Sequence, residues 1–478
     1  MTSAVRVRNP WTGACDYSFT PDTAAAVATA ADRLRAAQPA WAAAGVAGRA
    51  ATLRQWRDAL AARRSELYDA LSEDTGRCLL AATEIDGVLA AIDRWCDAAP
   101  DLLAEPEGQS ARMPSVAFRW QYVPYPVVGV ISPWNFPLTL SLIDAIPALI
   151  AGCAVLLKPS EVTPRFAEPL AASIADIPDL TDLVAVVRGP GDVGQALIDQ
   201  VDAICFTGSV ATGRKVAAQA AANFIPAFLE LGGKDPAIVT ASADLEAATT
   251  ALLRASVAAT GQACQSLERL YVDATIFDAF VDRLVEKAEQ VTINWPDKHA
   301  GQIGPLIFHR QADTIAGHIA DAVAKGATVH TGGEVEEHGG TWLRPTVLTD
   351  VTHHMAVMTE ETFGPVLPVM AFDTVDQAIA LANDTQFGLS AAVWAGTLEE
   401  AEAIARRIDA GAVSLNDGAL TSLINEAEKH AFKLSGLGGS RMGPAGLMRF
   451  VRKKALMAQS GTPVPLAAFD EANLTVEA

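Results

Sequence analysis

Apolar, strand-like runs alternate with helical segments over about a hundred residues in the first half of the chain. Beginning near residue 125, the runs read PVVGVIS, CAVLLKPS, LVAVVRG, DAICFTG and FLELGG, and segments with helical spacing separate them. Strands that alternate with helices in this way form a parallel sheet that helices cover on both faces. The sequence therefore predicts an α/β fold whose first sheet is of the nucleotide-binding sort.

A second α/β series follows the first. It starts with PAIVT, passes a helix containing ALLRASVAAT and ends with GAVSLND, and a helical layer over residues 21 to 100 precedes both series. The segment near 118 to 128 and the tail after about 452 fit neither series; elements that join subunits look like this, although a surface hairpin and an irregular end would explain them as well. The expected organisation is a first domain of residues 1–110 and 125–232, a second of residues 233–432, and oligomerisation elements at 111–124 and 450–478.

Composition and charge argue against several kinds of partner. The chain has 36 basic and 56 acidic residues, a formal charge of −20, and its basic residues are scattered. Nucleic acid and anionic membrane surfaces are therefore not expected partners. The six cysteines lie tens of residues apart without CxxC spacing, and no zinc-like spacing of histidines and cysteines occurs. We expect neither a disulfide framework nor a metal site.

One apolar segment has the length of a membrane span. Residues 138 to 157, LTLSLIDAIPALIAGCAVLL, contain Asp144, Pro147 and Gly152. A core helix that ends near Gly152, followed by a buried strand, explains the same residues better than a membrane helix. The N-terminal residues contain no apolar signal segment, and together with the cysteine usage this predicts a cytoplasmic protein.

Three polar residues could carry chemistry. Cys264 lies among small and polar residues in TGQACQS, and all eight histidines lie at or after His299. A free cysteine is usually a small buried hydrophobe, so this one is not diagnostic alone. Glu230 ends the run FLELGG, where it is either a surface charge or a general base in a partly dry crevice. Asn135, in ISPWNFP, either caps a turn or donates to an oxyanion, where such donors contribute about 3 to 4 kcal/mol.

Two glycine patterns could bind phosphate. RGPGDVGQAL matches the dinucleotide fingerprint G-x-G-x-x-G at Gly189, Gly191 and Gly194, but no acidic residue ends a strand about twenty positions later. CFTGSVATGRKV also joins a strand to a helix, and the N–H groups at the start of that helix could bind a pyrophosphate. Each pattern is weak by itself.

Taken together, the motifs resemble those of the NAD(P)-dependent aldehyde dehydrogenase superfamily. PWNFP, KPSEVTP, FTGSVATG, LELGGK, GQAC and EETFGPV occur in the family's order, and 34 positions (264 − 230) separate Glu230 from Cys264. The resemblance covers roughly residues 20 to 450. It implies that Cys264 is the nucleophile, that the Asn135 side chain and the Cys264 backbone N–H hold the oxyanion, and that Glu230 activates water to hydrolyse a thioester. It also implies that the first domain binds NAD, that the second is catalytic, and that the protein is a homodimer or homotetramer.

The same resemblance implies the cofactor site. FTGSVATG matches the family's pyrophosphate-binding helix start, and GPGDVG then borders the adenine. A carboxylate at Glu161 suits a ribose hydroxyl and should repel a 2′-phosphate, so we expect NAD rather than NADP. The expected cofactor-binding residues are Ile131, Trp134, Lys158, Glu161, Gly191, Gly208, Ser209, Gly213, Leu231, Glu361 and Phe363.

The substrate side departs from the family pattern. Many relatives have a lysine where this chain has Asp144, and the segment EKHAFKLSGLGG replaces the family's usual sequence. The residues expected to line the aldehyde tunnel include no arginine, which favours apolar aliphatic or aromatic aldehydes over semialdehydes. A catalytically silent member of the fold and a thiol esterase that uses Cys264 are the rival hypotheses. The expected tunnel residues are Leu138, Leu142, Ile143, Gln265 and Leu420.

Overall fold

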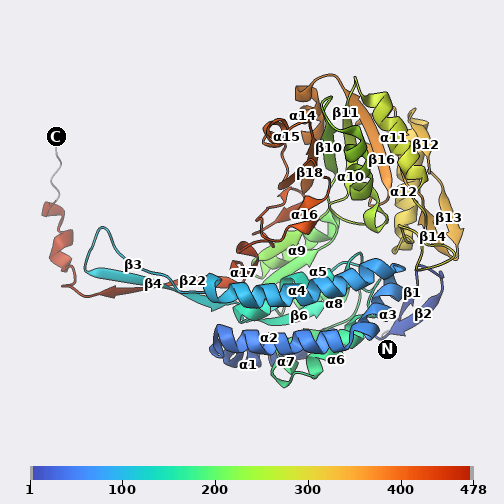
Figure 1. Ribbon diagram of the computed structural model, residues 1–478. Coiled ribbons are helices and arrows are strands. Elements are labelled where there is room, and N and C mark those ends of the chain that lie inside the picture. Colours follow the sequence, from blue (N-terminus) through green and yellow to red (C-terminus); the bar gives the residue numbers. More distant parts are fainter. Residues whose placement is uncertain (1–3, 474–478) are drawn as a thin grey trace.

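The fold consists of two α/β units and a projecting β-arm. The computed structural model describes residues 4–473, and Figure 1 shows the two units with the arm extending from one of them. The first unit contains a six-stranded sheet in the order β21-β9-β8-β5-β6-β7, which is parallel except for β21. Its strands are β5 (Val127–Ile131), β6 (Ala154–Lys158), β7 (Val184–Val186), β8 (Ala203–Thr207), β9 (Ala227–Glu230) and β21 (Gly436–Leu437).

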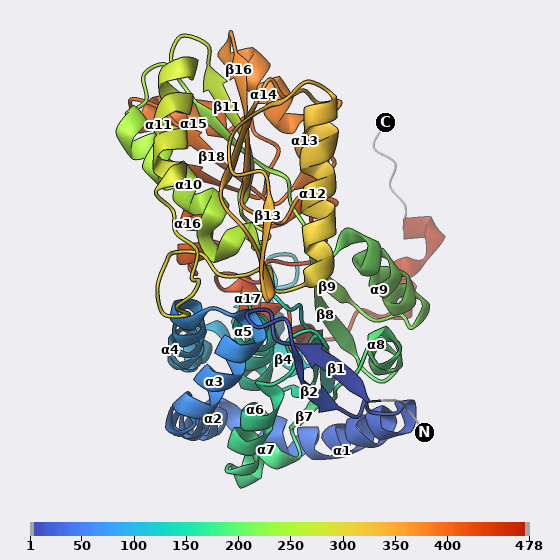
Figure 2. The same cartoon turned by 90° about the vertical axis from the view of Figure 1, so that its right-hand side faces the viewer.

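Two helical layers cover this sheet. α8 contacts α1 and α9 in one layer, whereas α5 contacts α2 and α4 in the other, and Figure 2 shows the two groups on opposite sides of the strands. The parallel, doubly covered sheet that the alternating pattern predicts is confirmed. The helices of this unit are α1 (Ala24–Ala43), α2 (Gly45–Ala62), α3 (Arg64–Thr75), α4 (Cys78–Leu102), α5 (Pro137–Ala151), α6 (Ala167–Ala175), α7 (Pro178–Thr181), α8 (Gly191–Ile198) and α9 (Val210–Ala222).

The long apolar segment forms α5 and then β6, as predicted. Pro137 lies in the first turn of α5, where its missing N–H has no cost. Gly152 ends the helix with a φ of 105°, a left-handed conformation that glycine adopts without strain. Every residue of β6 is buried. Within the described part of the chain, no helix is both long and apolar enough to cross a membrane.

The second unit contains a seven-stranded sheet in the order β12-β15-β16-β11-β10-β18-β19, in which only β12 runs antiparallel to its neighbour. Buried side chains form separate cores on its two faces. The strands are β10 (Asp235–Val239), β11 (Leu267–Asp273), β12 (Thr328–Thr331), β15 (Thr346–Thr349), β16 (Val366–Phe372), β18 (Ser390–Trp394) and β19 (Ala412–Leu415). The helices are α10 (Leu245–Val257), α11 (Phe277–Glu289), α12 (His309–Ala324), α13 (Ala356–Thr359), α14 (Val375–Asn383), α15 (Leu398–Ala405) and α16 (Leu420–Leu423), whereas α17 (Ala445–Met448) packs against α4 and α5 of the first unit.

The two segments that fit neither α/β series pair with each other in the β-arm. β22 (Val451–Gln459) runs antiparallel to β4 (Val116–Pro124) over nine residue pairs, and β3 (Glu107–Gln109) completes the arm. Met457 in β22 is 75% exposed. The oligomerisation role of this arm stays a prediction, and residues 474–478 of the predicted element lie outside the described residues. Three short pairs complete the fold: β1 (Val5–Arg8) with β2 (Cys15–Phe19), β13 (Val335–His338) with β14 (Gly340–Leu343), and β17 (Phe387–Gly388) with β20 (Phe432–Lys433).

Candidate active site

A cavity of about 620 Å³ lies at the carboxyl ends of the first sheet. The chain runs from β5 to β6 on one side and returns to β8 on the other, so β5 and β8 flank the point where the strand order reverses. Open parallel sheets bind ligands at this point. The cavity lining includes thirteen of the residues that the sequence predicted: Ile131, Trp134, Asn135, Lys158, Glu161, Gly191, Gly208, Ser209, Glu230, Leu231, Cys264, Glu361 and Phe363.

The N-terminus of α9 can bind an anion. Ser209 is the N-cap of this helix, and its Oγ accepts a hydrogen bond from the Thr212 N–H at 3.3 Å. Gly213 does not line the cavity; a Cβ at this position would lie 2.6 Å from the Leu231 side chain, so the glycine lets Leu231 pack against α9. Gly191 and Gly194 of the other glycine pattern border the same cavity. The donors and the volume fit a dinucleotide.

Cys264 follows a strained loop. Ala259, Thr260 and Gly261 have φ values of 55°, 61° and 67°, in the left-handed region that non-glycine residues rarely adopt. A Cβ on Gly261 would overlap the Gly364 backbone, so only glycine fits at this close approach. The buried Gln262 side chain fixes the loop, because its amide donates to the Ala259 and Pro305 carbonyls at 3.2 Å and 3.1 Å. Strain that the surroundings hold in place is common at functional sites.

The electrostatic surroundings of Cys264 disfavour the thiolate. Burial raises the pKa of the thiol to about 12, and the charges of Glu230 and Glu361 act in the same direction. Lys429 acts in the opposite direction. The protein groups therefore leave the sulfur protonated at neutral pH, and activation has to come from a positive charge brought into the cavity or from a base.

Asn135 is held rigidly beside the nucleophile loop. It is 4% exposed, and its Nδ2 donates to the Gln262 carbonyl at 3.0 Å. The buried guanidinium of Arg77 donates to the backbone carbonyl of Asn135. An amide nitrogen carries two hydrogens, so the second can be directed at an oxyanion. Arg77 is a supporting residue that the sequence analysis missed.

Two residues that close the far side of the cavity contact each other. The Phe363 and Trp134 rings meet edge to face, with centroids 5.4 Å apart. Phe363 has a φ of 52°, and Glu268 accepts its N–H at 2.8 Å. Glu361 lies beside it and accepts from the Gly233 N–H at 3.2 Å; its burial raises its pKa to about 8. A carboxyl group that is protonated near neutral pH can donate to as well as accept from a ribose hydroxyl.

Glu230 ends β9 next to a buried cationic cluster that sequence reasoning did not find. The Glu230 side chain is 20% exposed, and its Oε1 lies 3.9 Å from the Arg441 Nε. Arg441 also donates to the Thr207 hydroxyl at 2.6 Å and pairs with Asp144 at 2.9 Å. Arg449 contacts the other Asp144 oxygen. Asp144 thus anchors two cations at this end of β9.

We expect the Asp144→Ala substitution to destabilise the fold by about 3 to 5 kcal/mol, because it leaves two buried guanidinium groups without their counter-ion. Burial alone would raise the pKa of Asp144, but Arg441 and Arg449 outweigh this and lower it below 3.8. The stabilisation is therefore present at neutral pH and lost only as the pH falls through this lowered pKa. Thermal unfolding at pH 7 measures the loss. Asp376→Ala, which breaks an exposed pair with Arg407, is the matched control and should change Tm little.

The predicted tunnel residues need one correction. Leu138 and Leu142 are 0% and 1% exposed and pack in the core of the first unit, so neither lines an open path. In α5 they lie on the face opposite to Thr139, Leu140 and Ile143, which are only half-buried. Leu140 lines the cavity that contains Cys264. Of the three residues predicted on this helix, Leu138 and Leu142 pack in the core, whereas Ile143 lies on the half-buried face and its tunnel role stays a prediction.

A second cation missed by the sequence analysis contacts the residue that follows the nucleophile. The Gln265 amide satisfies both its oxygen and its nitrogen when the oxygen faces Lys429. In this orientation the oxygen accepts from the Lys429 Nζ at 2.7 Å, and the nitrogen donates to the Thr421 hydroxyl at 2.9 Å. Leu420, which precedes Thr421, is 36% exposed, and its tunnel role stays a prediction. The only available signal for Lys429 was the atypical segment in which it lies.

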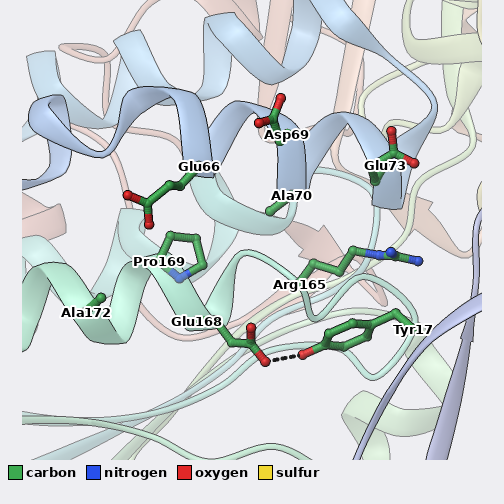
Figure 3. A pocket seen from close by; sticks show the side chains of 9 residues that line it. All are labelled: Tyr17, Glu66, Asp69, Ala70, Glu73, Arg165, Glu168, Pro169 and Ala172. Atoms are coloured by element: carbon green, nitrogen blue, oxygen red, sulfur yellow. Dashed lines mark hydrogen bonds between the residues drawn. The ribbon is translucent and has the colours of Figure 1, made fainter.

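A separate hollow of about 510 Å³ lies between α3 and α6, and Figure 3 shows its lining. One of its carboxylates, Glu168, already has partners: Tyr17 donates to it at 2.5 Å, and Arg188 contacts it at 3.2 Å. It contains no nucleophile, and we assign it no chemistry. Among residues 4–473, no group of histidines, cysteines and carboxylates is arranged to hold a metal ion.

The comparisons with known proteins agree with this geometry. The model of the aldehyde dehydrogenase family matches residues 1–456. A Mycolicibacterium smegmatis protein provisionally described as succinate-semialdehyde dehydrogenase (NADP(+)) is 40% identical over 91% of this chain and 84% of its own length. A Mycobacterium ulcerans protein with a similar description is 39% identical over the same shares. The solved structure of a provisionally described aldehyde dehydrogenase from Anabaena variabilis has 53% identity and a TM-score of 0.95, over 97% of this chain and 99% of its own.

The expectation of NAD rather than NADP is wrong, because the descriptions of these curated relatives specify NADP(+). The argument rested on repulsion by Glu161. In the structure, the Glu161 side chain is 40% exposed and forms an ion pair with Lys158 at 3.6 Å. Such a carboxylate can turn toward solvent. Lys158 and Lys215 both line the cavity and offer positive charge to a phosphate.

Proposed function

The chain belongs to the aldehyde dehydrogenase family, and from that premise we propose that it oxidises an aldehyde to a carboxylic acid with NADP. One observation carries the proposal: Cys264, Asn135 and Glu230, which lie far apart in the sequence, border the same cavity as the residues that fit a dinucleotide. A nucleophile, an amide donor and a carboxylate base around one cavity are the groups that acyl chemistry on sulfur needs.

In the first half of the proposed reaction, the Cys264 thiol first releases its proton to solvent, and the thiolate sulfur then forms a bond to the aldehyde carbon while the carbonyl electron pair moves to oxygen. The Asn135 Nδ2 and the Cys264 backbone N–H stabilise the resulting oxyanion of the thiohemiacetal. When bound, the oxidised nicotinamide supplies the hydride acceptor and a positive charge near the sulfur. Loss of hydride from the carbon restores the carbonyl group and leaves a thioester on Cys264.

In the second half, Glu230 takes a proton from water, and the hydroxide adds to the thioester carbon. The carbon–sulfur bond then breaks, so that the acid leaves and the Cys264 thiolate is restored. The net change is aldehyde plus water plus NADP⁺ to acid plus NADPH, with release of protons. The Arg441 Nε lies 3.9 Å from Oε1 of the Glu230 carboxylate that accepts this proton.

For the cofactor, we propose that Lys158 and Lys215 receive the 2′-phosphate of NADP while Glu161 turns away. Lys215→Met should then raise the KM for NADP about tenfold, roughly the worth of one charge-assisted contact of 1.4 kcal/mol. Glu161→Gln should lower the KM for NADP, because it removes a negative charge beside the phosphate. Initial rates of NADPH formation at varied NADP concentration measure the KM of both variants. Lys325→Met, which removes a lysine ammonium from the end of α12, is the control and should leave this KM unchanged.

The aldehyde itself has two candidates. The descriptions of the relatives name succinate semialdehyde, and we propose a short semialdehyde with a carboxylate at its far end. The half-buried apolar face of α5, with Leu140 and Ile143, supports the other candidate, an apolar aliphatic or aromatic aldehyde.

A substrate panel tests the proposal. NADPH formation is followed with succinic semialdehyde, hexanal and benzaldehyde, each with NADP and with NAD. We expect turnover with NADP and the highest kcat/KM for succinic semialdehyde. No NADPH with any aldehyde, combined with ester hydrolysis, would favour the esterase hypothesis, and inactivity in both assays would favour a catalytically silent protein.

Two further properties belong to the proposal. We propose that the β-arm joins two copies of the chain, because exposed apolar side chains such as Leu456 and Met457 lie along β22. We also propose a cytoplasmic location, because the six cysteines are free thiols and Cys264 has to stay reduced to act.

A further inference from the structure

Lys429 places a half-buried ammonium group beside the residue that follows the nucleophile. Its Nζ donates to the Thr421 carbonyl at 2.9 Å and to the Gln265 side-chain oxygen at 2.7 Å. Its backbone N–H donates to Ser440 at 3.1 Å, which ties this part of the chain to the segment that carries Arg441. The Lys429 side chain is therefore held in one position by neutral oxygen atoms.

No carboxylate neutralises this ammonium group by direct contact. In the part of the chain that the structure describes, Lys429 forms no ion pair within 4.0 Å, and its third N–H has no protein acceptor. Burial lowers the pKa of Lys429, and the charges of Cys264, Glu230 and Asp235 only partly restore it. A buried charge without a counter-ion is costly. A ligand anion placed here would remove that cost.

The position of Lys429 relative to Cys264 defines which ligand could supply the anion. Cys264 borders the dinucleotide cavity on one side, and Lys429 is not part of that lining. Lys429 nevertheless lies beside the nucleophile, because its Nζ donates at 2.7 Å to the side chain of Gln265, the residue after Cys264, and its charge opposes the rise in the pKa of the Cys264 thiol. An aldehyde bound to Cys264 whose far end lies beside Gln265 would therefore meet this ammonium group.

We propose that Lys429 binds the carboxylate at the far end of the substrate and thereby selects short semialdehydes of dicarboxylic acids over neutral aldehydes. Gln265 and Thr421 hold the ammonium group in place for this contact. The inference rests on the proposed aldehyde oxidation and adds to it the residue that sets the substrate class. Lys429 contacts substrate in this account and is a specificity-determining residue.

The test compares succinic semialdehyde with butanal, which has the same number of carbons and no charge. For Lys429→Met, the ratio of kcat/KM values for these substrates should fall about 100-fold, mainly through the KM for the semialdehyde, because a buried charge pair loses one partner. Lys429→Arg keeps the charge and should retain most of the ratio, which also guards against a methionine variant that fails to fold. Lys325→Met should leave the ratio unchanged. Inhibition by succinate, relative to butyrate, gives a readout without turnover and should weaken by a similar factor.

The outcomes separate this inference from the proposed function. If the parent enzyme prefers succinic semialdehyde and Lys429→Met keeps that preference, the carboxylate lies elsewhere and the inference is overturned while the function stands. An equal loss with both substrates would show that Lys429 acts on Cys264 instead, and would also overturn it. If the parent oxidises no aldehyde, the proposed function fails first.

Discussion

Replacing Cys264 by alanine is expected to lower NADPH formation by about 10⁴-fold or more, since no other group can form the bond to the aldehyde carbon. The substitution removes one sulfur atom from a loop that Gln262 and Gly261 hold in place, so the fold should survive. Steady-state rates with succinic semialdehyde and NADP measure the loss. Unchanged Tm and retained binding of NADP would show that only the chemistry is affected.

The matched control is Cys15→Ala. Cys15 is also a free cysteine, but it is exposed on β2 and does not line the cavity. This variant should keep the parent rate. Activity that persists in Cys264→Ala would show that Cys264 is not the nucleophile and that the reaction does not pass through a thioester on it.

Replacing Glu230 by glutamine should lower the steady-state rate by about 10² to 10⁴-fold, the contribution of a positioned general base. The first half of the reaction does not use Glu230, so one equivalent of NADPH per Cys264 should still form rapidly before turnover slows. Stopped-flow absorbance separates this burst from the slow phase. The substitution keeps the size of the side chain and removes only its basicity.

Glu402→Gln makes the same change in an exposed i,i+4 pair with Arg406 and should behave like the parent. If Glu230→Gln shows no burst, Glu230 is needed for a step before the thioester forms and acts as the base that activates the thiol. Parent-like turnover would mean that another group activates the water.

The fold could be predicted largely because its determinants are local. Pro137 and Gly152 mark the two ends of α5 in the sequence itself, and the buried run after them can only be a strand. Likewise, Cys264, Glu230 and Asn135 lie in the motifs that carry the resemblance to the family. Their convergence on one cavity follows from the strand order, since Asn135 and Glu230 follow or end parallel strands of the same sheet.

The substrate side could not be predicted, because it depends on contacts between distant segments. Arg441 meets Asp144 across 297 positions, and Lys429 meets Gln265 only after α16 folds back over the nucleophile loop. The phase of α5 is a similar case: Leu138 and Leu140 are equally apolar in sequence, and only packing decides that Leu140 borders the cavity. For Glu161, the charge is evident from the sequence, whereas only the structure shows the exposure that decides how strongly this charge opposes a 2′-phosphate.

Mass spectrometry of the intact Glu230→Gln enzyme, mixed with NADP and succinic semialdehyde and quenched in acid, tests the central claim most directly. Because this variant should form the thioester and hydrolyse it slowly, we predict a mass increase of one succinyl group, located by digestion on the peptide that contains Cys264. NADPH formation without any adduct, or an adduct on a different residue, would contradict the account.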